Sequence, residues 1–342
     1  MSFYSFAGVA GAVAVFLLGL KLLSESTGKL VTGKLSDVVY KATLNRFSAV
    51  GIGAGVTAVA QSSVAINAVL VSLADAGAIS LFGACAVVIG SNVGTTVTAQ
   101  LVSLSFGAFD ISVVGGVSAF VGVLLSSSKK VKVSLAGEML LGFGLVFLGI
   151  DLMTSGVESF YGYPWFRKFF LIENPFVLVV NGFLLTAVFQ SSSVVSSMLV
   201  ILSAGGMITF ENSVFVILGA NVGTTVSVLL ISSRKSVAAR RVAFFNFLFN
   251  LLGAALFFVP TLLFGEKITE LFTSTSASLG RAVANFHTFF NLATGLIALP
   301  FLKWLSRLLL VAVKDGEKIG RAGGAKSWLK RRLYAIKKAK TT

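Results

Sequence analysis

Apolar residues occupy long runs along the chain, and short polar stretches separate them. Runs such as 3–20, 135–150, 242–263 and 283–302 approach the roughly 20 apolar residues that a helix needs to cross a bilayer core. Each run therefore predicts a membrane-spanning helix. The expected spans cover about residues 3–21, 80–104, 109–126, 133–153, 208–231, 242–264 and 283–311.

Two further apolar segments, 47–74 and 174–204, carry a polar cluster in the middle and do not fit a simple span. The arms of the first, 47–60 and 64–74, are each too short to cross a core of about 30 Å at 1.5 Å of rise per residue. We therefore expect each segment to form a re-entrant hairpin of two half-helices, which enters the membrane and returns to the same side.

The two hairpins belong to an internal repeat. Residues 57–63 (Thr-Ala-Val-Ala-Gln-Ser-Ser) recur at 186–192, with Phe189 in place of the second Ala, so the separation is 190 − 61 = 129. The segment 90–97 (Gly-Ser-Asn-Val-Gly-Thr-Thr-Val) recurs at 219–226, where 221 − 92 is again 129. This constant offset predicts a first transmembrane repeat at 1–128, a second at 129–258, an additional C-terminal transmembrane helix at 259–312 and a tail at 313–342.

Basic residues predict the orientation of the repeats. They gather in four places, around 21–46, 129–132, 234–241 and 326–340. Excess Lys and Arg beside membrane spans mark the cytoplasmic side. If all four clusters are cytoplasmic, the N-terminus lies outside, the C-terminus inside, and hairpins 47–74 and 174–204 enter from opposite faces. The expected fold class is thus an all-α integral membrane protein with inverted-topology repeats, a plan shared by many secondary transporters.

Composition supports a multi-pass protein of the cell (cytoplasmic or inner) membrane. Hydrophobic residues make up 56% of the 342 and charged residues only 12%, with a mean hydropathy of +0.92, whereas soluble domains carry about 25% charged residues. The formal net charge of +15 could suggest nucleic acid, but the basic residues border the spans, so no nucleic-acid partner is expected. The single cysteine, Cys85, excludes an intrachain disulfide and a Cys-based metal cluster.

The tail beyond residue 313 predicts a different partner. Seven basic residues and no acid lie between 326 and 340, mixed with aromatic and aliphatic residues. This pattern is typical of an amphipathic helix on the anionic inner leaflet of the bilayer. A solvated tail, or one that leads into a further domain, is the alternative. The oligomeric state is left open, and a homodimer is compatible with the plan.

The chemistry of the hairpin tips predicts sites for an anion and a cation. A second half-helix that begins near Ser63 or Ser192 offers free N–H groups and a positive partial charge, with Ser as a favoured N-cap. Two opposed N-termini of this kind can hold an oxyanion. The first half-helices, ending near Ala60 and Phe189, present carbonyl oxygens, and the following spans add oxygens suited to Na⁺ from Asn92, Thr95, Thr96, Asn221, Thr224 and Thr225.

Other interpretations of these polar residues remain. A single Ser or Thr in a membrane helix usually donates to the i−4 carbonyl or eases helix packing. Intramembrane polar residues are also functional candidates, and Asn246, Asn250, His287 and Asn291 are expected to line a cavity. For each Asn an interhelical hydrogen bond is the alternative; His287 could respond to pH or be structural.

The doubled Gln-Ser-Ser segments, each followed by Gly-x-Asn-Val-Gly-Thr-Thr, resemble the type II sodium/phosphate cotransporter family and its bacterial relatives. The segments 241–250 and 285–291 are similar to further motifs of that family. The resemblance implies Na⁺-coupled uptake of inorganic phosphate by alternating access, with no cofactor and no enzymatic activity. It implies that phosphate contacts Gln61, Ser62, Ser63, Gln190, Ser191, Ser192 and Ser193, and that sodium contacts Gln61, Ser62, Gln190 and Ser191 together with the oxygens of the following spans.

One departure and one alternative accompany the resemblance. The first copy has Val64 where the second has Ser193, so one hydroxyl is missing and the two halves need not be equivalent. A phosphate exporter or a passive anion channel of the same fold is the alternative function. A membrane enzyme is disfavoured, because the sequence offers a single histidine and few carboxylates for a catalytic centre.

Overall fold

The described residues of the computed structural model, 3–43, 45–104, 111–157, 172 and 174–314, are helical wherever they form regular structure. The helices are α1 (Phe3–Ala42), α2 (Arg46–Ala60), α3 (Ser63–Asp75), α4 (Leu81–Leu104), α5 (Ile111–Ser126), α6 (Val131–Val157), α8 (Pro175–Phe189), α9 (Ser192–Ala204), α10 (Phe210–Ser232), α11 (Val237–Ser274) and α12 (Leu279–Ala312). The predicted basic tail lies outside the described residues from 315 onward.

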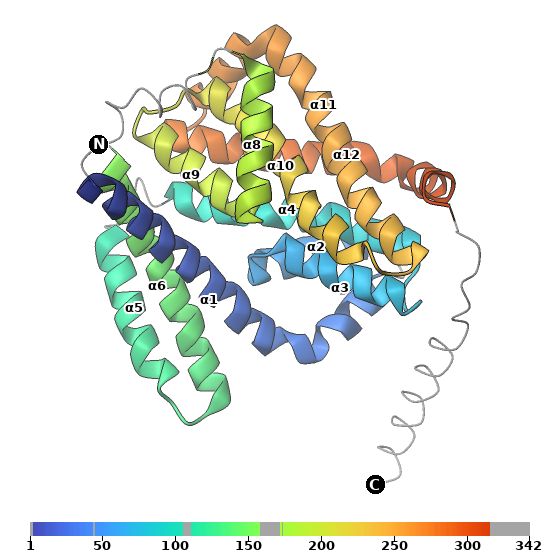
Figure 1. Cartoon of the computed structure of the whole chain (residues 1–342), viewed down its shortest axis with the longest axis horizontal. Helices are drawn as coiled ribbons and strands as arrows, with labels where there is room; N and C mark the ends of the chain where they lie inside the picture. Colours follow the sequence, from blue (N-terminus) through green and yellow to red (C-terminus); the bar gives the residue numbers. More distant parts are fainter. Residues whose placement is uncertain (1–2, 44, 105–110, 158–171, 173, 315–342) are drawn as a thin grey trace.

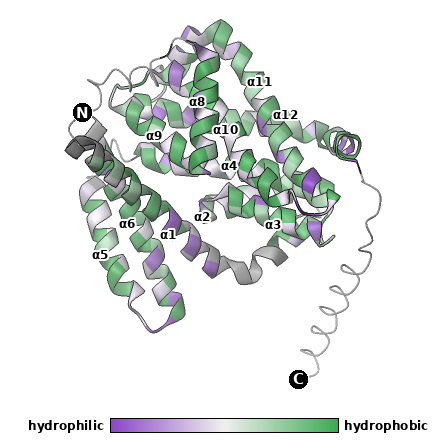
Figure 2. Ribbon diagram, viewed as in Figure 1, coloured by the Kyte–Doolittle hydropathy of each residue, from purple (hydrophilic) through white to green (hydrophobic). Residues whose placement is uncertain are grey.

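Six of the described helices are long and apolar enough to cross a membrane: segments Ala10–Thr27, Leu81–Leu104, Val131–Ser155, Phe210–Ser232, Val237–Ser274 and Leu279–Ala312. Figure 2 shows hydrophobic residues along most of the helices, with hydrophilic ones clearest on the middle of α1. The chain is therefore a multi-pass membrane protein. Helix α5, predicted as a seventh span, is described over only 16 residues, or about 24 Å at 1.5 Å per residue.

Several helices extend beyond the apolar runs that predicted them. Helix α1 continues to Ala42 rather than ending near residue 21, and α11 continues to Ser274 rather than ending near 264. In both places polar residues follow the apolar run without a proline, so the backbone hydrogen bonding has no reason to stop where the hydrophobicity does. Hydrophobicity thus located the spans but not the helix ends.

Helices α1, α5 and α6 lie together on one side of the molecule (Figure 1). Helix α6 packs against both of its neighbours, α1 and α5. Glycines allow the close approach: a Cβ added to Gly142 of α6 would lie 2.6 Å from the backbone nitrogen of Leu23 in α1. Close packing through small residues is a common way for membrane helices to associate.

A carboxylate joins α1 to α6. The Ser26 hydroxyl donates to Glu138 Oε2 at 2.9 Å, and Lys29 Nζ lies 3.7 Å from the same oxygen. Glu138 therefore has a cationic partner on α1, which explains an acidic residue within an apolar run.

The remaining helices contain the most similar part of the two copies of the repeat, and these segments have the same local structure. Helices α2 and α3 begin and end 129 residues before α8 and α9, because 46, 60, 63 and 75 become 175, 189, 192 and 204. The N-caps also correspond: the Asn45 side chain accepts from the Phe47 amide, and Asn174 accepts from the Phe176 amide. The repeat detected in the sequence is thus a repeat of structure.

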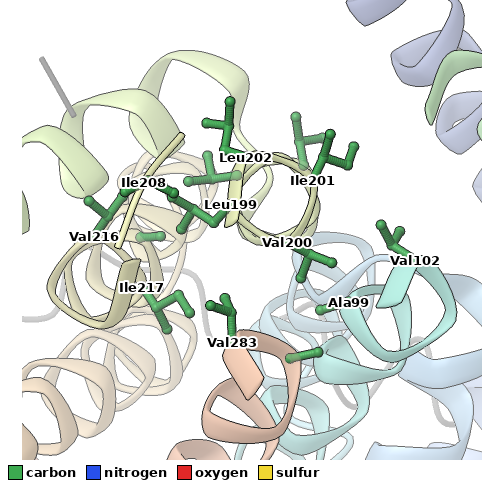
Figure 3. Packing of buried hydrophobic residues seen from close by; sticks show 14 of the residues in the cluster. Ala99, Val102, Leu199, Val200, Ile201, Leu202, Ile208, Val216, Ile217 and Val283 are labelled. Carbon is green, nitrogen blue, oxygen red and sulfur yellow. The ribbon is translucent and has the colours of Figure 1, made fainter. Parts of the chain in front are cut away.

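The two copies interlock through their second short helices. Helix α3 packs against α10 of the other copy, and α9 packs against α4. In Figure 3, Val200 of α9 lies beside Ala99 and Val102 of α4. These residues belong to one buried hydrophobic cluster. The long helices α11 and α12 pack against this pair of copies as well as against each other.

Candidate functional site

Each copy contains a break between two short helices, at Gln61 and at Gln190. Their φ angles are 52° and 56°, and they are the only non-glycine residues with positive φ among the described residues. A left-handed residue ends a helix, and its own amide still donates to the preceding turn: Gln61 N to Thr57 O and Gln190 N to Thr186 O, both 2.7 Å. The predicted end of each first half-helix, at Ala60 and Phe189, is confirmed.

Serine begins the second short helix in both copies. Ser62 and Ser191 are the N-caps, and their hydroxyl oxygens accept from the amides of Ala65 (3.2 Å) and Val194 (3.4 Å). Capping uses one hydroxyl in each copy and leaves other first-turn N–H groups without an intrahelical acceptor. Ser63, Ser192 and Ser193 are buried in the first turns of α3 and α9, while Val64 is only partly buried.

The Gln61 side chain is fixed at both ends. Its Nε2 donates to Ala58 O at 2.5 Å, and its Oε1 accepts from the Thr98 hydroxyl of α4. Gln190, at the equivalent position, is exposed. Thr98 was not among the predicted site residues, although it has a hydroxyl counterpart, Ser227, at the repeat offset of 129. That paired hydroxyl was the sequence signal that could have identified it.

The predicted oxygens of α4 and α10 lie on continuous helices, and most are buried. Their hydrogen atoms point to carbonyls of the same helix: Thr95 to Ser91 O (3.0 Å), Thr96 to Val93 O (2.8 Å), Thr224 to Ala220 O (3.0 Å) and Thr225 to Val222 O (2.7 Å). Asn92 and Asn221 likewise donate to Val88 O and Ile217 O, at 2.9 Å each. Because a hydroxyl that donates one bond retains acceptor lone pairs, these oxygens can still face a cation.

Glycine brings the first short helix of each copy against the following long helix. A Cβ added to Gly94 would lie 2.9 Å from Thr57 Cβ, and one added to Gly223 would lie 2.9 Å from Thr186 Cβ. The helices are not unwound at these glycines. They instead allow a close approach of the two helices.

A buried threonine distinguishes the two copies at this contact. The Thr57 hydroxyl donates to Ser91 Oγ at 2.8 Å. The equivalent Thr186 faces α10 where residue 220 is alanine, and its buried hydroxyl has no hydrogen-bond partner. The repeated backbone therefore carries unequal polar contacts.

An amide cluster joins α4 to α11. Asn92 Nδ2 lies 3.4 Å from Asn246 Oδ1, and Asn250 Nδ2 donates to the same oxygen at 3.1 Å. Asn291 Nδ2 donates to His287 O at 2.9 Å within α12. All four residues expected to line a cavity, Asn246, Asn250, His287 and Asn291, are at most 2% exposed. Asn246 makes the interhelical hydrogen bond that was the alternative, whereas Asn250 and Asn291 donate to carbonyls of their own helices.

Gln100 provides a second polar link, which sequence reasoning missed. Its Nε2 donates to Thr288 Oγ1 at 2.7 Å and to Ala284 O at 3.1 Å, so it joins α4 to α12. The repeat offered no signal here, since residue 229 is leucine.

The segments around the two helix breaks carry no charged side chains. Residues 57–67 and 186–197 contain no Asp, Glu, Lys, Arg or His, so an anion there would meet backbone N–H groups, helix dipoles and hydroxyls. In the described part of the chain no group of three or more His, Cys, Asp or Glu could hold a metal ion. An apolar cavity of about 200 Å³ lies between α11 and α12, and another of about 350 Å³ lies among α8, α10 and α11. Their apolar linings do not suit an ion.

Comparisons with known proteins give the context for this geometry. A family model described as Na⁺/Pi-cotransporter matches residues 15–155 and 165–294. The chain is 26% identical over 311 residues to the "Putative inorganic phosphate export protein YjbB" of Escherichia coli K12, covering 90% of this chain and 56% of that protein. The chain therefore spans about half the length of this relative.

Two further relatives differ in how far they match. The "Uncharacterized protein YqeW" of Bacillus subtilis is 25% identical over 307 residues, covering 87% of this chain and 94% of that protein. The human "Sodium-dependent phosphate transport protein 2C" is 31% identical over 156 residues, covering 42% of this chain and 26% of that protein. No solved structure matches the chain.

The family model extends over both helix breaks and over the α4 and α10 segments that follow them. This is also the region where the doubled Gln-Ser-Ser pattern resembles the family. The chain belongs to the Na⁺/Pi-cotransporter family.

Proposed function

We propose that this protein is a secondary active transporter that couples sodium to the uptake of inorganic phosphate by alternating access. The observation that carries the proposal is the pair of matching helix breaks, in which a left-handed glutamine is followed by a serine N-cap at residues 61–62 and again at 190–191. Membership of the Na⁺/Pi-cotransporter family and the name of the human relative support phosphate and sodium as the transported ions.

In this proposal α2–α3 and α8–α9 are re-entrant hairpins that enter the membrane from opposite faces. Their lengths support the idea, because helices of 13 and 15 residues extend about 20 and 22 Å and cannot cross a core of about 30 Å. The break then lies within the membrane, where backbone groups need partners that hydrocarbon cannot supply. The ions and their water are the partners in this mechanism.

Phosphate would bind at the N-terminal turns of α3 and α9, to the amides and hydroxyls of Ser62, Ser63, Ser191, Ser192 and Ser193. Helix N-termini bind oxyanions because their N–H groups and dipoles converge on the negative charge. Since the donors are neutral, the site can release the anion again, which a carrier requires.

Sodium would bind beside the phosphate, at the C-terminal carbonyls of α2 and α8. Gln61, Gln190, Asn92 and Asn221 and the threonine pairs of α4 and α10 would complete its oxygen ligands. A cation next to the anion reduces the cost of carrying either charge through the membrane. This mutual stabilisation is the physical basis of the proposed coupling.

The experiment is uptake of radiolabelled phosphate into proteoliposomes. An inward Na⁺ gradient should drive accumulation that an equal K⁺ gradient does not drive. The double variant S62A/S191A should lower phosphate binding at least tenfold, whereas Ser306→Ala should not, because Ser306 is partly buried on α12, far along the chain from both breaks, and donates only to Lys303 O. Uptake that is equal with Na⁺ and K⁺ would refute sodium coupling.

Export of phosphate is the second candidate, and the name of the Escherichia coli relative favours it. The same proteoliposomes distinguish the directions when they are preloaded with phosphate. Efflux driven by the sodium gradient in an orientation-selected population would support export. Passive flux along the phosphate gradient, indifferent to any cation gradient, would identify an anion channel instead.

A further inference from the structure

The helices α11 and α12 also resemble each other, in a second internal repeat with an offset of its own. Residues 242–250 (Val-Ala-Phe-Phe-Asn-Phe-Leu-Phe-Asn) correspond to 283–291 (Val-Ala-Asn-Phe-His-Thr-Phe-Phe-Asn), since 283 − 242 and 291 − 250 are both 41. The same positions are buried in both, including Phe245 with Phe286 and Phe249 with Phe290.

The two helices also occupy matching places relative to the two copies. Helix α11 packs against α10 and α3, while α12 packs against α4 and α9, which are their counterparts at the 129-residue offset. Smaller contacts correspond too, α11 with α4 and α12 with α10. The matched neighbours show that the repeat concerns position in the fold as well as sequence.

Within this repeat His287 stands where the first helix has Asn246. The backbone environments are alike: Asn250 Nδ2 donates to Asn246 O at 2.8 Å, and Asn291 Nδ2 donates to His287 O at 2.9 Å. The side chains differ. Asn246 Oδ1 accepts from Asn92 and Asn250, whereas both ring nitrogens of His287 are buried and have no hydrogen-bond partner.

An imidazole without partners has unused capacity for a ligand. The neutral ring offers one N–H donor and one acceptor, and the protonated ring offers two donors. A sodium ion would satisfy only the unprotonated nitrogen. An oxyanion is matched by the N–H groups, and it also supplies the negative charge that a protonated ring would need in an apolar setting.

The neighbouring helices offer no obvious counter-ion. Helix α9 has no titratable residue, α4 has only Cys85, and α10 has only Glu211, which lies beside Gly265 in the kinked part of α11. On α12 the preceding charge is Arg281, which donates to Ser103 Oγ. The other charges of these two helices lie near their ends: Arg240, Arg241, Glu266, Lys267 and Glu270 on α11, and Lys303 and Arg307 on α12.

We propose that His287 is a protonation site linked to oxyanion binding, so that the transported anion and a proton on this ring stabilise each other. The proposal rests on the proposed function, and it places the proton on α12 and not at the matching position of α11, because Asn246 cannot be protonated. The proton comes from water when the anion binds and returns to water when the anion leaves. Linkage is reciprocal: acid strengthens anion binding, and the anion increases the protonated fraction of His287.

The chain offers a direct measurement, because His287 is its only histidine. Protein without a histidine tag, labelled with ¹⁵N-histidine and reconstituted in lipid, is titrated by NMR from about pH 8 to 5, the range of an ordinary imidazole. We expect phosphate to increase the protonated fraction at a given pH relative to chloride. An identical titration with and without phosphate would overturn the proposal. The measurement uses only the natural protein, so it does not depend on whether a variant folds.

Transport provides the second readout. The apparent affinity for phosphate is measured between about pH 8 and 5.5 for the natural protein and for His287→Asn, which copies Asn246. Phosphate ionises equally in both assays, so dividing the affinity of the natural protein by that of the variant removes the effect of phosphate ionisation. We expect this ratio to rise about fivefold or more on acidification. A ratio that does not change with pH would contradict the linkage.

Controls separate this idea from folding and from the proposed function. Phe289→Leu, on an exposed position of the same helix, should behave as the natural protein. If His287→Asn elutes abnormally in gel filtration, which would indicate misfolding, His287→Gln replaces it in the transport assay. Absence of sodium-dependent phosphate uptake at every pH would refute the proposed function. Normal uptake with the same pH profile in protein and variant would refute only the role of His287.

Discussion

The substitution Gly53→Ala tests whether contact between α2 and α4 positions the first helix break. A Cβ added to Gly53 would lie 3.1 Å from the Val87 carbonyl carbon and 3.2 Å from the Ser91 nitrogen, and nearer still to the Val87 oxygen. All three atoms belong to the backbone of α4, so no side-chain rotation can relieve the overlap. Because carbon contacts are favourable only from about 3.5 Å, α2 must move by on the order of 1 Å.

The same helix supplies matched controls. Gly51 and Gly55 are exposed, and a Cβ added to either meets no atom within 4 Å. Alanine in place of glycine favours a helix by about 1 kcal/mol at all three positions. That gain cancels in the comparison, so G53A should be less stable than G51A or G55A by the cost of overpacking, about 1–3 kcal/mol.

The functional effect should exceed the effect on stability. Gln61 ends α2 eight residues beyond Gly53, so a shift of α2 displaces the glutamine from Thr98. A binding site tolerates displacements of its ligand atoms of only about 0.5 Å, which is less than the expected shift of α2. We therefore expect sodium-driven phosphate uptake to fall tenfold or more in G53A. Thermal unfolding in detergent and uptake in proteoliposomes measure the two effects. If G53A matched G55A in both assays, close packing of α2 on α4 would not be what positions the tip.

Three other substitutions test single polar side chains. Thr57→Val should lower stability by about 1 kcal/mol because it removes the hydrogen bond to Ser91, whereas Thr186→Val should be neutral or stabilising because it replaces a buried hydroxyl without a partner; equal melting temperatures would contradict this. For Asp75, burial raises the pKa, but bonds from Ser236 and the charge of Lys235 outweigh it, so the pKa lies below its ordinary 3.8. A depressed pKa means that the ionised carboxylate stabilises the fold at neutral pH, and that this stabilisation is lost as pH falls through the pKa of Asp75 in the folded protein. Asp75→Asn should therefore lower the melting temperature at pH 7. Below about pH 4 the melting temperatures of the variant and the natural protein should converge.

The helix breaks could be predicted from the sequence because local chemistry determines them. A serine that can cap a helix, placed in two septets that differ only at residue 60 and Phe189, defined the ends of α2 and α8 and the starts of α3 and α9 to within a residue. Capping depends on neighbours within three or four positions, which the sequence displays directly.

Contacts between distant segments could not be predicted in the same way. The bonds from Thr98 to Gln61 and from Gln100 to Thr288 join residues 37 and 188 positions apart, and nothing local in the sequence indicates which polar side chains will meet. The repeat of α11 and α12 was missed for another reason. Only five of its nine aligned residues are identical, and its clearest support is the pair of matching neighbours in the fold.

The unequal glutamines of the two tips lead to the final prediction. Gln61 is held by Ala58 O and Thr98, whereas Gln190 is exposed and its side chain has no hydrogen-bond partner among the described residues. Gln61→Ala should therefore cost stability, about 1 kcal/mol for the lost bonds, and Thr98→Val should reproduce part of that loss.

Gln190→Ala should leave the melting temperature unchanged, because it removes no bond within the protein. If the free amide serves the transported ions, the same variant should nevertheless raise the Na⁺ concentration required for half-maximal phosphate uptake. A variant with normal sodium dependence would show that the exposed amide of the second tip is not a ligand. The glutamine of the second tip would then serve neither the fold nor the ions, whereas the glutamine of the first tip holds α2 to α4.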